Sequence, residues 1–385
     1  MKSVWAVGLM TGTVLDGYID VALLKTDGDR TVEFGPYSLE PYQTGTVELL
    51  KETLESALNW NFSGPEPDIF RQAEQLITAE QSQAVANVLS AAGIDRADVA
   101  AIGFHGQTVL HHPPDKTTDG SDERSIGQTR QLGNGQAMAD NLGIPVVWDF
   151  RSADMRSGGQ GAPLAPVYHR ALLQKARDEH TLDGNVAILN LGGVANITWW
   201  GGGDRLAAFD TGPANAPIND WVIKHGLGRM DVDGKLAASG SVDENKLKEL
   251  LEHPYLSAPW PKSLDRFDFS AAMAEGCSAA DGASLLTAFS AAAVGKALDL
   301  LPERPGTLVL SGGGRHNPVL ADAISKRAAA NIVNADELGW RGDAVEAECF
   351  AYLAIRSLQA LPLSFPSTTG VTAACKGGIV SYPVD

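Results

Sequence analysis

Short apolar runs and longer stretches of helical periodicity alternate along the chain. Residues 4–10 and 19–26 are apolar runs joined by a polar turn that contains glycine, which predicts a β-hairpin. Apolar positions then recur at helical spacing over 47–58 and 69–93, and a glycine stands where the second helix should end. A short strand over 98–104 follows. Alternating strands and helices are typical of an α/β architecture.

The same order of elements begins again in the second half of the chain. Residues 186–191 and 197–200 are two more apolar runs around a glycine turn, and a strand over 206–209 leads to a helix around 216–225. The two hairpins lie about 180 residues apart, which indicates an internal duplication in the order of elements. Further helices and one strand are then predicted, the helices over 284–301, 317–330 and 344–358 and the strand from 307.

Length and composition narrow the class of protein. A chain of 385 residues exceeds the usual size of one hydrophobic core, so we expect two domains of about 150 to 200 residues with a cleft between them. The formal net charge of −17 and the lack of a long Lys/Arg cluster argue against a nucleic-acid partner. No stretch approaches the roughly 18 apolar residues of a membrane span, and no cleavage pattern of a signal peptide follows the first residues. Cys277, Cys349 and Cys375 show neither zinc-ligand nor disulfide spacing, which fits a reducing cytosol.

A polar segment at residues 149–169 lies between an apolar strand that begins at Ile144 and a helix that begins near Leu164. It carries the acids Asp149 and Asp154, two arginines and several glycines and prolines. Strand-to-helix junctions are where α/β proteins keep their chemistry. The segment is therefore interpreted as a site and not as a linker.

Glycine turns at three places could hold phosphate groups through backbone N–H donors. They lie at Gly12, at 192–193 and at 312–314, and together they predict a nucleotide that two domains bind. Asp16 or Asp20 would position magnesium near the first turn. The structural alternative is that the first turn only closes a hairpin and the last only ends a strand.

Asp210 follows an apolar strand, so its carboxylate would lie beside the proposed phosphates, although an Asx turn would give it a purely structural role. His105 could contact a substrate, although a single histidine at a strand end is as often structural. His111 and His112 have no partners at metal-ligand spacing, so no zinc site is predicted.

A series of motifs occurs in a fixed order along the chain: GLMTGT with a following DG (residues 8–17), HGQTV (105–109), GGQGAP (158–163), NLGGVANIT (190–198), FDTGPAN (209–215), PKS (261–263) and GDAVEA (342–347). Together they resemble the anhydro-N-acetylmuramic acid kinase family, from about residue 8 to the C-terminal TTG. Thr11 and Val14 stand where the family carries serines.

The resemblance implies an α/β fold of the actin/hexokinase-like ATPase type, with two RNase H-like domains and an ATP cleft between them. Domain I would span 1–135, with the segment of about 345–385 packed back on it, and domain II would span 136–344. The implied protein is a cytoplasmic homodimer of peptidoglycan recycling. It would use ATP and Mg²⁺ on a small amino-sugar substrate, with no nucleic-acid or membrane partner.

The resemblance also implies roles for individual residues. Asp154 and Glu346 would be catalytic, and Asp16 and Asp210 would hold Mg²⁺ through water. The implied nucleotide-binding residues are Gly12, Thr13, Asp16, Gly17, Gly192, Gly193, Asn196, Asp210, Gly212, Gly312, Gly313 and Gly314. The implied substrate-binding residues are His105, Gln107, Thr108, Arg151, Gly159 and Gln160.

The implied reaction opens the 1,6-anhydro bridge of 1,6-anhydro-N-acetylmuramic acid and phosphorylates O6, giving N-acetylmuramic acid 6-phosphate and ADP. The bridging O6 carries no proton, so the base must act on a water that attacks C1 while O6 moves to phosphorus. Asp154 stands at the motif position of this base, and Asp149 competes as a cap or an orienting group. Arg151 could pair with an acid or with the substrate's lactyl carboxylate. Glu346 would help organise the water or the sugar, and its alternative is an acid on a helix surface.

Two other functions remain open at this point. One is a kinase of the same fold that phosphorylates a simple hydroxyl group of an amino sugar. The other is a nucleotide-binding, actin-like protein that polymerises or acts as a chaperone and performs no sugar chemistry; it would have no need for the acid-rich junction at 149–169.

Overall fold

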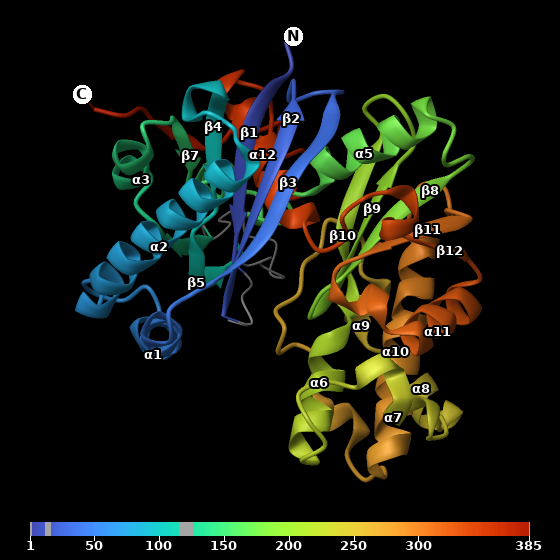
Figure 1. Cartoon of the computed structure of the whole chain (residues 1–385). Helices are drawn as coiled ribbons and strands as arrows, with labels where there is room; N and C mark the ends of the chain where they lie inside the picture. Colours follow the sequence, from blue (N-terminus) through green and yellow to red (C-terminus); the bar gives the residue numbers. More distant parts are fainter. Residues whose placement is uncertain (1, 12–16, 115–126, 385) are drawn as a thin grey trace. The chain divides into compact units, whose positions relative to one another are not determined.

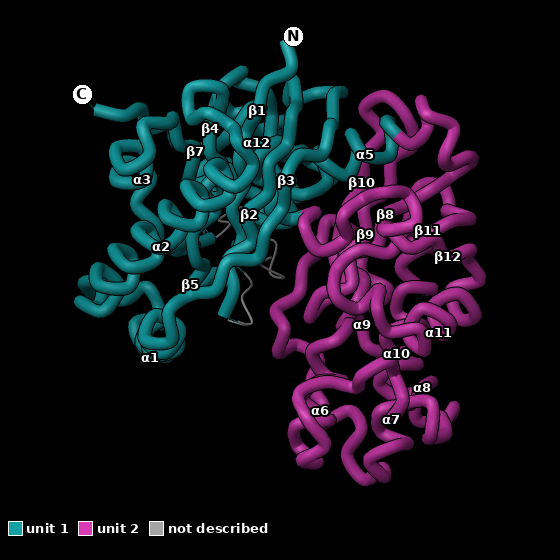
Figure 2. The backbone as a smooth tube through the Cα atoms, in the orientation of Figure 1, with its two compact units in different colours: residues 1–175, 346–385 teal, residues 176–345 magenta. Residues whose placement is uncertain are grey.

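The computed structural model describes residues 2–11, 17–114 and 127–384, and it divides the chain into two compact units. Unit 1 comprises residues 1–175 and 346–385, and unit 2 comprises residues 176–345 (Figure 2). The expected boundary after residue 135 differs from this division, because residues 136–175 belong to unit 1, where residues 146–148 form a strand of its sheet. Within the described ranges, no helix is long and apolar enough to cross a membrane.

Unit 1 is built on a mixed sheet of six strands in the order β13-β7-β4-β1-β2-β3 (Figure 1). The predicted first hairpin is confirmed, because β1 and β2 pair antiparallel from Val4↔Thr26 to Met10↔Asp20. β4 lies parallel to β1, and β7 lies parallel to β4. The strands span Val4–Met10 (β1), Tyr18–Thr26 (β2), Val32–Pro41 (β3), Val99–Phe104 (β4), Val146–Trp148 (β7) and Ile379–Ser381 (β13).

The two faces of this sheet carry residues of different size. Val7 and Phe104 belong to a core cluster that includes residues of α2 (Asp68–Ala92), which packs on β2 and β3. Side chains alternate along a strand, so Gly8 and Gly103 face the other side, where α12 (Val345–Leu358) lies. A Cβ on Gly8 would come within 1.8 Å of the Ala347 carbonyl oxygen, so α12 can approach the strands only because this position is glycine.

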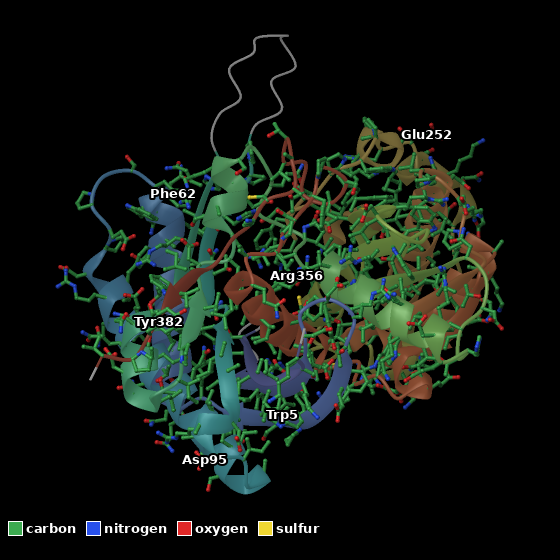
Figure 3. All side chains as sticks on the ribbon, turned by 90° about the horizontal axis from the view of Figure 1, so that it is seen from above. Trp5, Phe62, Asp95, Glu252, Arg356 and Tyr382 are labelled. Carbon is green, nitrogen blue, oxygen red and sulfur yellow. The ribbon has the colours of Figure 1, made fainter. Side chains whose placement is uncertain are left out.

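Side chains of α12 bind the C-terminal part of unit 1 to the N-terminal part. The buried guanidinium of Arg356 (Figure 3) donates to the carbonyl oxygens of Gly28 at 2.7 Å and of Pro362 at 2.8 Å. The Tyr352 hydroxyl donates to the Asp29 carbonyl oxygen at 2.8 Å. Residues 346–385 are therefore an integral part of unit 1.

Unit 2 repeats the strand order of unit 1. Its sheet reads β10-β9-β8-β11-β12, so in both units the third, second, first, fourth and fifth strands are neighbours in that order. The second predicted hairpin is confirmed by the antiparallel pairing of β8 with β9, and β11 is parallel to β8. The duplication expected from the order of elements is thus present in the sheet topology. The strands span Val186–Leu191 (β8), Val194–Trp200 (β9), Leu206–Pro213 (β10), Thr307–Ser311 (β11) and Asn331–Asn334 (β12).

Helices complete the mixed α/β architecture that the sequence predicts. The second helix, α2, ends as expected at Gly93, which adopts a left-handed conformation with φ of 65°. The remaining helices and the additional β-hairpin are α1 (Thr44–Trp60), β5 (Gln107–His112), β6 (Gln128–Leu132), α3 (Gly135–Leu142), α4 (Ser152–Arg156), α5 (Pro166–Asp178), α6 (Asn215–Lys224), α7 (Lys235–Ala238), α8 (Glu244–Leu250), α9 (Pro254–Ser257), α10 (Ala279–Asp299) and α11 (Pro318–Ala328), with short 3₁₀ helices η1 (Arg96–Asp98), η2 (Val232–Gly234), η3 (Ala271–Ala274), η4 (Gly313–His316) and η5 (Ala335–Leu338).

Candidate active site

The carboxylate of Asp154 is the most tightly held acidic group of the 149–169 junction. It lies on α4, and the residue is only 2% exposed. One oxygen, Oδ1, accepts hydrogen bonds from the hydroxyls of Ser364 and Thr369, the latter at 2.6 Å. The other, Oδ2, accepts the backbone N–H of Gly161 at 2.6 Å. Three donors, one from the loop after α4 and two from the distant C-terminal segment, therefore fix the orientation of this carboxylate.

The glycines of the junction make room for that carboxylate. A Cβ on Gly159 would lie 2.2 Å from Asp154 Oδ2, which is closer than real Cβ contacts come. Gly161 has a φ of 73°, a conformation that side chains rarely adopt, and this turn aims its N–H at Asp154. The backbone N–H of Gln160 donates to the Thr369 carbonyl oxygen at 2.8 Å. The loop after α4 is thus fitted to Asp154 and to the C-terminal segment.

Asp149, the competing acid, lies three residues before the start of α4 at Ser152. Its Oδ1 accepts the backbone N–H of Ser152 at 3.2 Å, and its own backbone has a φ of 49°. A side chain that satisfies an N–H in the first turn of a helix acts as a cap. Asp149 therefore has the capping role that was its alternative to that of the base.

Arg151 connects several parts of the junction. Its Nη1 donates to the Gly161 carbonyl oxygen at 2.7 Å, and its Nε and Nη2 lie 3.3 and 3.0 Å from Nε2 of His105. Burial lowers the pKa of Arg151, and the nearby charges of Glu346 and Asp154 act in the opposite direction. Arg151 therefore lies close enough to both predicted catalytic acids for their charges to act on its pKa. Glu346 is exposed in the first turn of α12, so its alternative as a helix-surface acid also stays open.

His105 is buried and neutral. Burial and the charge of Arg151 lower its pKa to about 3. Its Nδ1 lies 2.8 Å from the Gly106 carbonyl oxygen, so Nδ1 carries the proton and Nε2 accepts from Arg151. Both ring nitrogens have protein partners, so a polar contact with a sugar would have to replace one of them.

A cavity of about 140 Å³ lies beside His105 in unit 1. Asp149 and Ser152 from the start of α4, Gln131 from β6 and Trp148 from β7 also line it. Its volume is a few times the roughly 30 Å³ that one water occupies in the liquid. Gln107 and Thr108 are not among its lining residues: Gln107 is fully buried, and the Thr108 hydroxyl accepts from Gln131 Nε2 at 3.3 Å.

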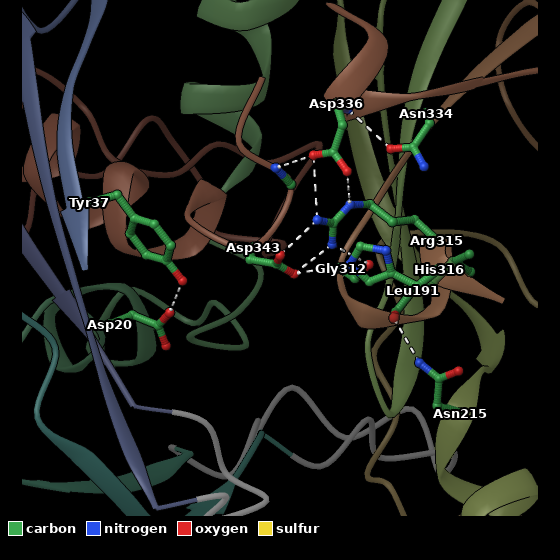
Figure 4. A network of polar contacts seen from close by, with 11 residues as sticks. Asp20, Tyr37, Leu191, Asn215, Gly312, Arg315, His316, Asn334, Asp336 and Asp343 are labelled. Carbon is green, nitrogen blue, oxygen red and sulfur yellow. Dashed lines mark hydrogen bonds and ion pairs between the residues drawn. The ribbon is translucent and has the colours of Figure 1, made fainter. Parts of the chain in front are cut away.

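The first glycine turn is only partly within the described residues. Gly12, Thr13, Val14 and Asp16 lie outside them, whereas Gly17 has a φ of 95°. At the edges of the turn, the Thr11 hydroxyl donates to the Gly106 carbonyl oxygen at 3.3 Å. Asp20 accepts the hydroxyl of Tyr37 at 2.8 Å (Figure 4).

Polar residues form a row across the sheet of unit 2. Strand pairing aligns Ser311 with Asn190, Asn190 with Asn196, and Asn196 with Asp210, so four adjacent strands place these side chains on one face. The Ser311 hydroxyl oxygen is buried and has no hydrogen-bond partner among the described residues. The turn at Gly192–Gly193 follows this row, and Asn215 Nδ2 holds the turn by donating to the Leu191 and Gly192 carbonyl oxygens at 2.9 Å each (Figure 4 shows the contact with Leu191).

Asp210 is a half-buried residue at one end of this row. Burial raises its pKa to about 7, against the opposing effects of a hydrogen bond from the Leu264 N–H and of the Lys262 charge. That N–H donates to Oδ2 at 2.8 Å from a residue 54 positions away, so the observed contact is not an Asx turn. Gly212 lies two residues further, and a Cβ there would come within 2.8 Å of Ala293 Cβ, which gives this glycine a packing role against α10.

The glycines at 312–314 differ in what surrounds them. Gly312 has a φ of 73°, and a Cβ there would lie 2.3 Å from Asn190 Oδ1. A Cβ on Gly314 would lie 2.6 Å from Leu191 Cβ. At Gly313, by contrast, a Cβ would meet no described atom within 4 Å. The middle glycine therefore leaves the backbone open to the close approach of a ligand.

Comparison with known proteins identifies the family. A family model described as anhydro-N-acetylmuramic acid kinase matches residues 4–383. The chain belongs to this family. An anhydro-N-acetylmuramic acid kinase of Mesorhizobium japonicum is 59% identical over 378 residues, which cover 98% of this chain and 99% of the relative. One of Rhizobium rhizogenes is 60% identical with the same coverage, and one of Rhizorhabdus wittichii is 47% identical over the full length of both chains.

One residue beside the glycine turn at 312–314 of this anhydro-N-acetylmuramic acid kinase family member is not predicted from the sequence. Arg315 follows the glycine triplet, and its buried guanidinium binds Asp336 and Asp343 (Figure 4). Asp343 belongs to the GDAVEA motif, so the pairing joins this motif to a residue beside the glycine turn, 28 positions earlier in the chain. The sequence carries no local signal for this pairing, because the two acids lie 21 and 28 positions after Arg315.

Proposed function

We propose that this chain phosphorylates O6 of 1,6-anhydro-N-acetylmuramic acid with ATP while water opens the anhydro bridge at C1. The products are N-acetylmuramic acid 6-phosphate and ADP. Membership of the anhydro-N-acetylmuramic acid kinase family supports this substrate, as does the high identity with relatives of that name over nearly the whole chain.

The reaction needs a general base for the attacking water, because the bridging O6 carries no proton that a base could remove. In the proposed reaction the water oxygen forms a bond to C1, the C1–O6 bond breaks, and O6 forms a bond to the γ-phosphorus as the bond from that phosphorus to the β-phosphate oxygen breaks. The water proton passes to Asp154. General-base catalysis of this kind contributes about 10²- to 10⁴-fold in rate.

The single observation that carries this assignment is the support of the Asp154 carboxylate. Ser364, Thr369 and Gly161 hold both of its oxygens, and Gly159 leaves the space beside Oδ2 free of a side chain. Such support keeps a reacting group in one geometry, which reduces the entropy that the reaction would otherwise cost. Arg151 stabilises the same loop through the Gly161 carbonyl oxygen.

For the nucleotide, we propose the glycine turns and the polar row of unit 2. The open backbone at Gly313 and the buried, unpartnered Ser311 hydroxyl support a ligand at this edge of the sheet. The described residues contain no cluster of three or more His, Cys, Asp or Glu that could hold a metal. Magnesium in kinases commonly needs only one or two carboxylates besides phosphate and water, and Asp210 fits that requirement. Bound Mg²⁺ would neutralise charge on the transferred phosphoryl group.

Cellular context and assembly complete the proposal. The family resemblance supports a cytoplasmic enzyme of cell-wall recycling that acts as a homodimer. Analytical ultracentrifugation of the purified chain tests the dimer, because a single species of 40.6 kDa would contradict it.

Product analysis in ¹⁸O-labelled water tests the reaction. The label should appear at C1 of the sugar and not in the phosphate. Asp154→Asn should lose at least about 10²-fold in kcat while it still binds the sugar. Asp149→Asn is the matched control and should retain most of the activity. Label in the phosphate, or equal activity of the Asp154 variant and the wild type, would overturn the proposal.

A further inference from the structure

Arg315 in unit 2 uses all of its hydrogen-bond donors on protein groups. Its Nε donates to Asp336 Oδ2 at 3.0 Å, and its Nη2 reaches Asp336 Oδ1 at 3.4 Å. The Asp343 carboxylate accepts from Nη1 at 2.6 Å and from Nη2 at 2.8 Å. Nη1 also donates to the Gly312 carbonyl oxygen at 3.1 Å (Figure 4). An arginine has five N–H donors, so none is left for a ligand.

The guanidinium lies inside the unit while its partners reach the surface. The Arg315 side chain is 2% exposed, whereas those of Asp336 and Asp343 are 46% and 52% exposed. Burial lowers the pKa of Arg315, but hydrogen bonds and charges from Asp343 and Asp336 more than offset this effect. The same contact lowers the pKa of Asp343. A buried cation with two acids remains charged, and charge-assisted bidentate pairs are geometrically specific.

The groups that Arg315 holds belong to the glycine turn and to the segment before α12. The contact with the Gly312 carbonyl fixes a residue with positive φ, next to the open backbone of Gly313. On the other side, a Cβ on Gly342 would lie 2.3 Å from Arg315 Nε, so this glycine lets the chain approach the guanidinium closely. The Gly342 N–H in turn donates to Asp336 Oδ1 at 3.1 Å.

We infer that Arg315 is a positioning residue for the nucleotide: it holds the 312–314 turn in the shape in which its backbone receives ATP. Arg315 itself does not touch the ligand. This inference rests on the proposed function, in which the same turn binds nucleotide. A lysine in its place would keep the charge but could not make the forked contacts with two carboxylates and a carbonyl at once.

Binding measurements with Arg315→Lys test the inference. The dissociation constant for ADP, measured by calorimetry well below the unfolding temperature, should rise at least about tenfold. The dissociation constant for the anhydro sugar should change less than about twofold. In steady-state kinetics the KM for ATP should rise while the KM for the sugar stays constant. A purely structural role would lower the melting temperature without separating the two ligands in this way.

Arg327→Lys is the matched control, because Arg327 lies in the same unit and its guanidinium pairs with Glu244, at 2.5 Å, and not with the glycine turn in the part of the chain that the structure describes. It should leave ADP binding unchanged. Asp336→Asn is the second variant: it removes one charge but keeps a hydrogen-bonding side chain, and it should raise the ADP dissociation constant at least about threefold. If Arg315→Lys does not fold, ADP binding by Asp336→Asn alone tests the inference.

The possible failures are distinguishable. If the wild type binds ADP and the folded Arg315→Lys variant, or in its absence Asp336→Asn, binds it equally well, the inference about Arg315 is overturned and the proposed function stands. If the wild type binds no ADP, the proposed function itself fails, and with it the inference.

Discussion

Replacement of Gly159 by alanine is the sharpest perturbation of the proposed base, because it changes no ionisable group. The new Cβ would lie 2.2 Å from Asp154 Oδ2 and 2.6 Å from Val371 Cγ1, whereas real Cβ contacts essentially never fall below 3.0 Å. The carboxylate would have to retreat by about 0.8 Å, the difference between 3.0 and 2.2 Å. Rotation offers no easy escape, because Thr369 and Gly161 hold its two oxygens.

The expected loss in kcat follows from the size of that displacement. A misplacement of about 1 Å in a reacting group can cost about 10²-fold in rate. Complete loss of a general base costs about 10²- to 10⁴-fold. We therefore expect Gly159→Ala to lower kcat by about 10²-fold, with the loss in Asp154→Asn as its upper limit.

The assay is ADP release at saturating ATP and anhydro sugar, with melting temperature recorded for each variant. Gly45→Ala is the matched control: Gly45 lies in α1, and a Cβ there would meet no described atom within 4 Å. Its kcat should stay within about twofold of the wild type. A Gly159→Ala enzyme with wild-type kcat would refute the reasoning, because the placement of the Asp154 carboxylate would then not limit the reaction.

Three further predictions concern nucleotide binding and pH. Gly313→Ala should raise the ADP dissociation constant at least about tenfold by filling the open approach to the backbone; Gly306→Ala, which also meets no described atom within 4 Å, should not, and equal effects in calorimetry would contradict the assignment. Burial raises the pKa of Asp210 to about 7, so its contribution to stability is lost as pH rises from about 4 to 7. In urea titrations, the unfolding free energy of Asp210→Asn should therefore rise relative to that of the wild type over this pH interval, and parallel curves would contradict the raised pKa of Asp210. Burial lowers the pKa of His105 to about 3 and of His169 to about 4, so stability present above about pH 6.5 is lost as pH falls, by at most about 1.4 kcal/mol per pH unit for each. His105→Asn should reduce the dependence of the unfolding free energy on pH between pH 6 and 5. An unchanged dependence would show that the His105 ring is protonated in the folded protein.

Local patterns in the sequence predict the elements well where one face of an element is buried. Apolar runs correctly predict both hairpins. Helical periodicity followed by Gly93 correctly predicts α2 and its C-terminal end. The sequence pattern does not predict β3, because most of its positions are exposed or half-buried and it contains Gly35 and Pro36. Glycine and proline are rare in strands. The division between the two units falls between residues 175 and 176, inside α5, so no turn or linker in the sequence marks it.

Local sequence patterns predict only part of the candidate active site. The polar junction drew attention to Asp154, but its hydroxyl partners Ser364 and Thr369 lie more than 200 positions further along the chain. No local rule connects residues at that distance. Likewise, His105 is recognisable as a histidine at a strand end, yet only the fold shows that Arg151 donates to it. The contacts between segments are a property of tertiary packing and not of periodicity.

The return of the chain to unit 1 has a consequence for its biosynthesis. Residues 346–385 leave the ribosome after unit 2 has been made, yet they supply the helix that packs on Gly8 and Gly103 and the hydroxyls that hold Asp154. A nascent chain can therefore complete its second unit while its first unit still lacks a layer. Translation of the final segment completes that layer and adds the two hydroxyl donors, so a truncated polypeptide would hold Asp154 by the Gly161 N–H alone.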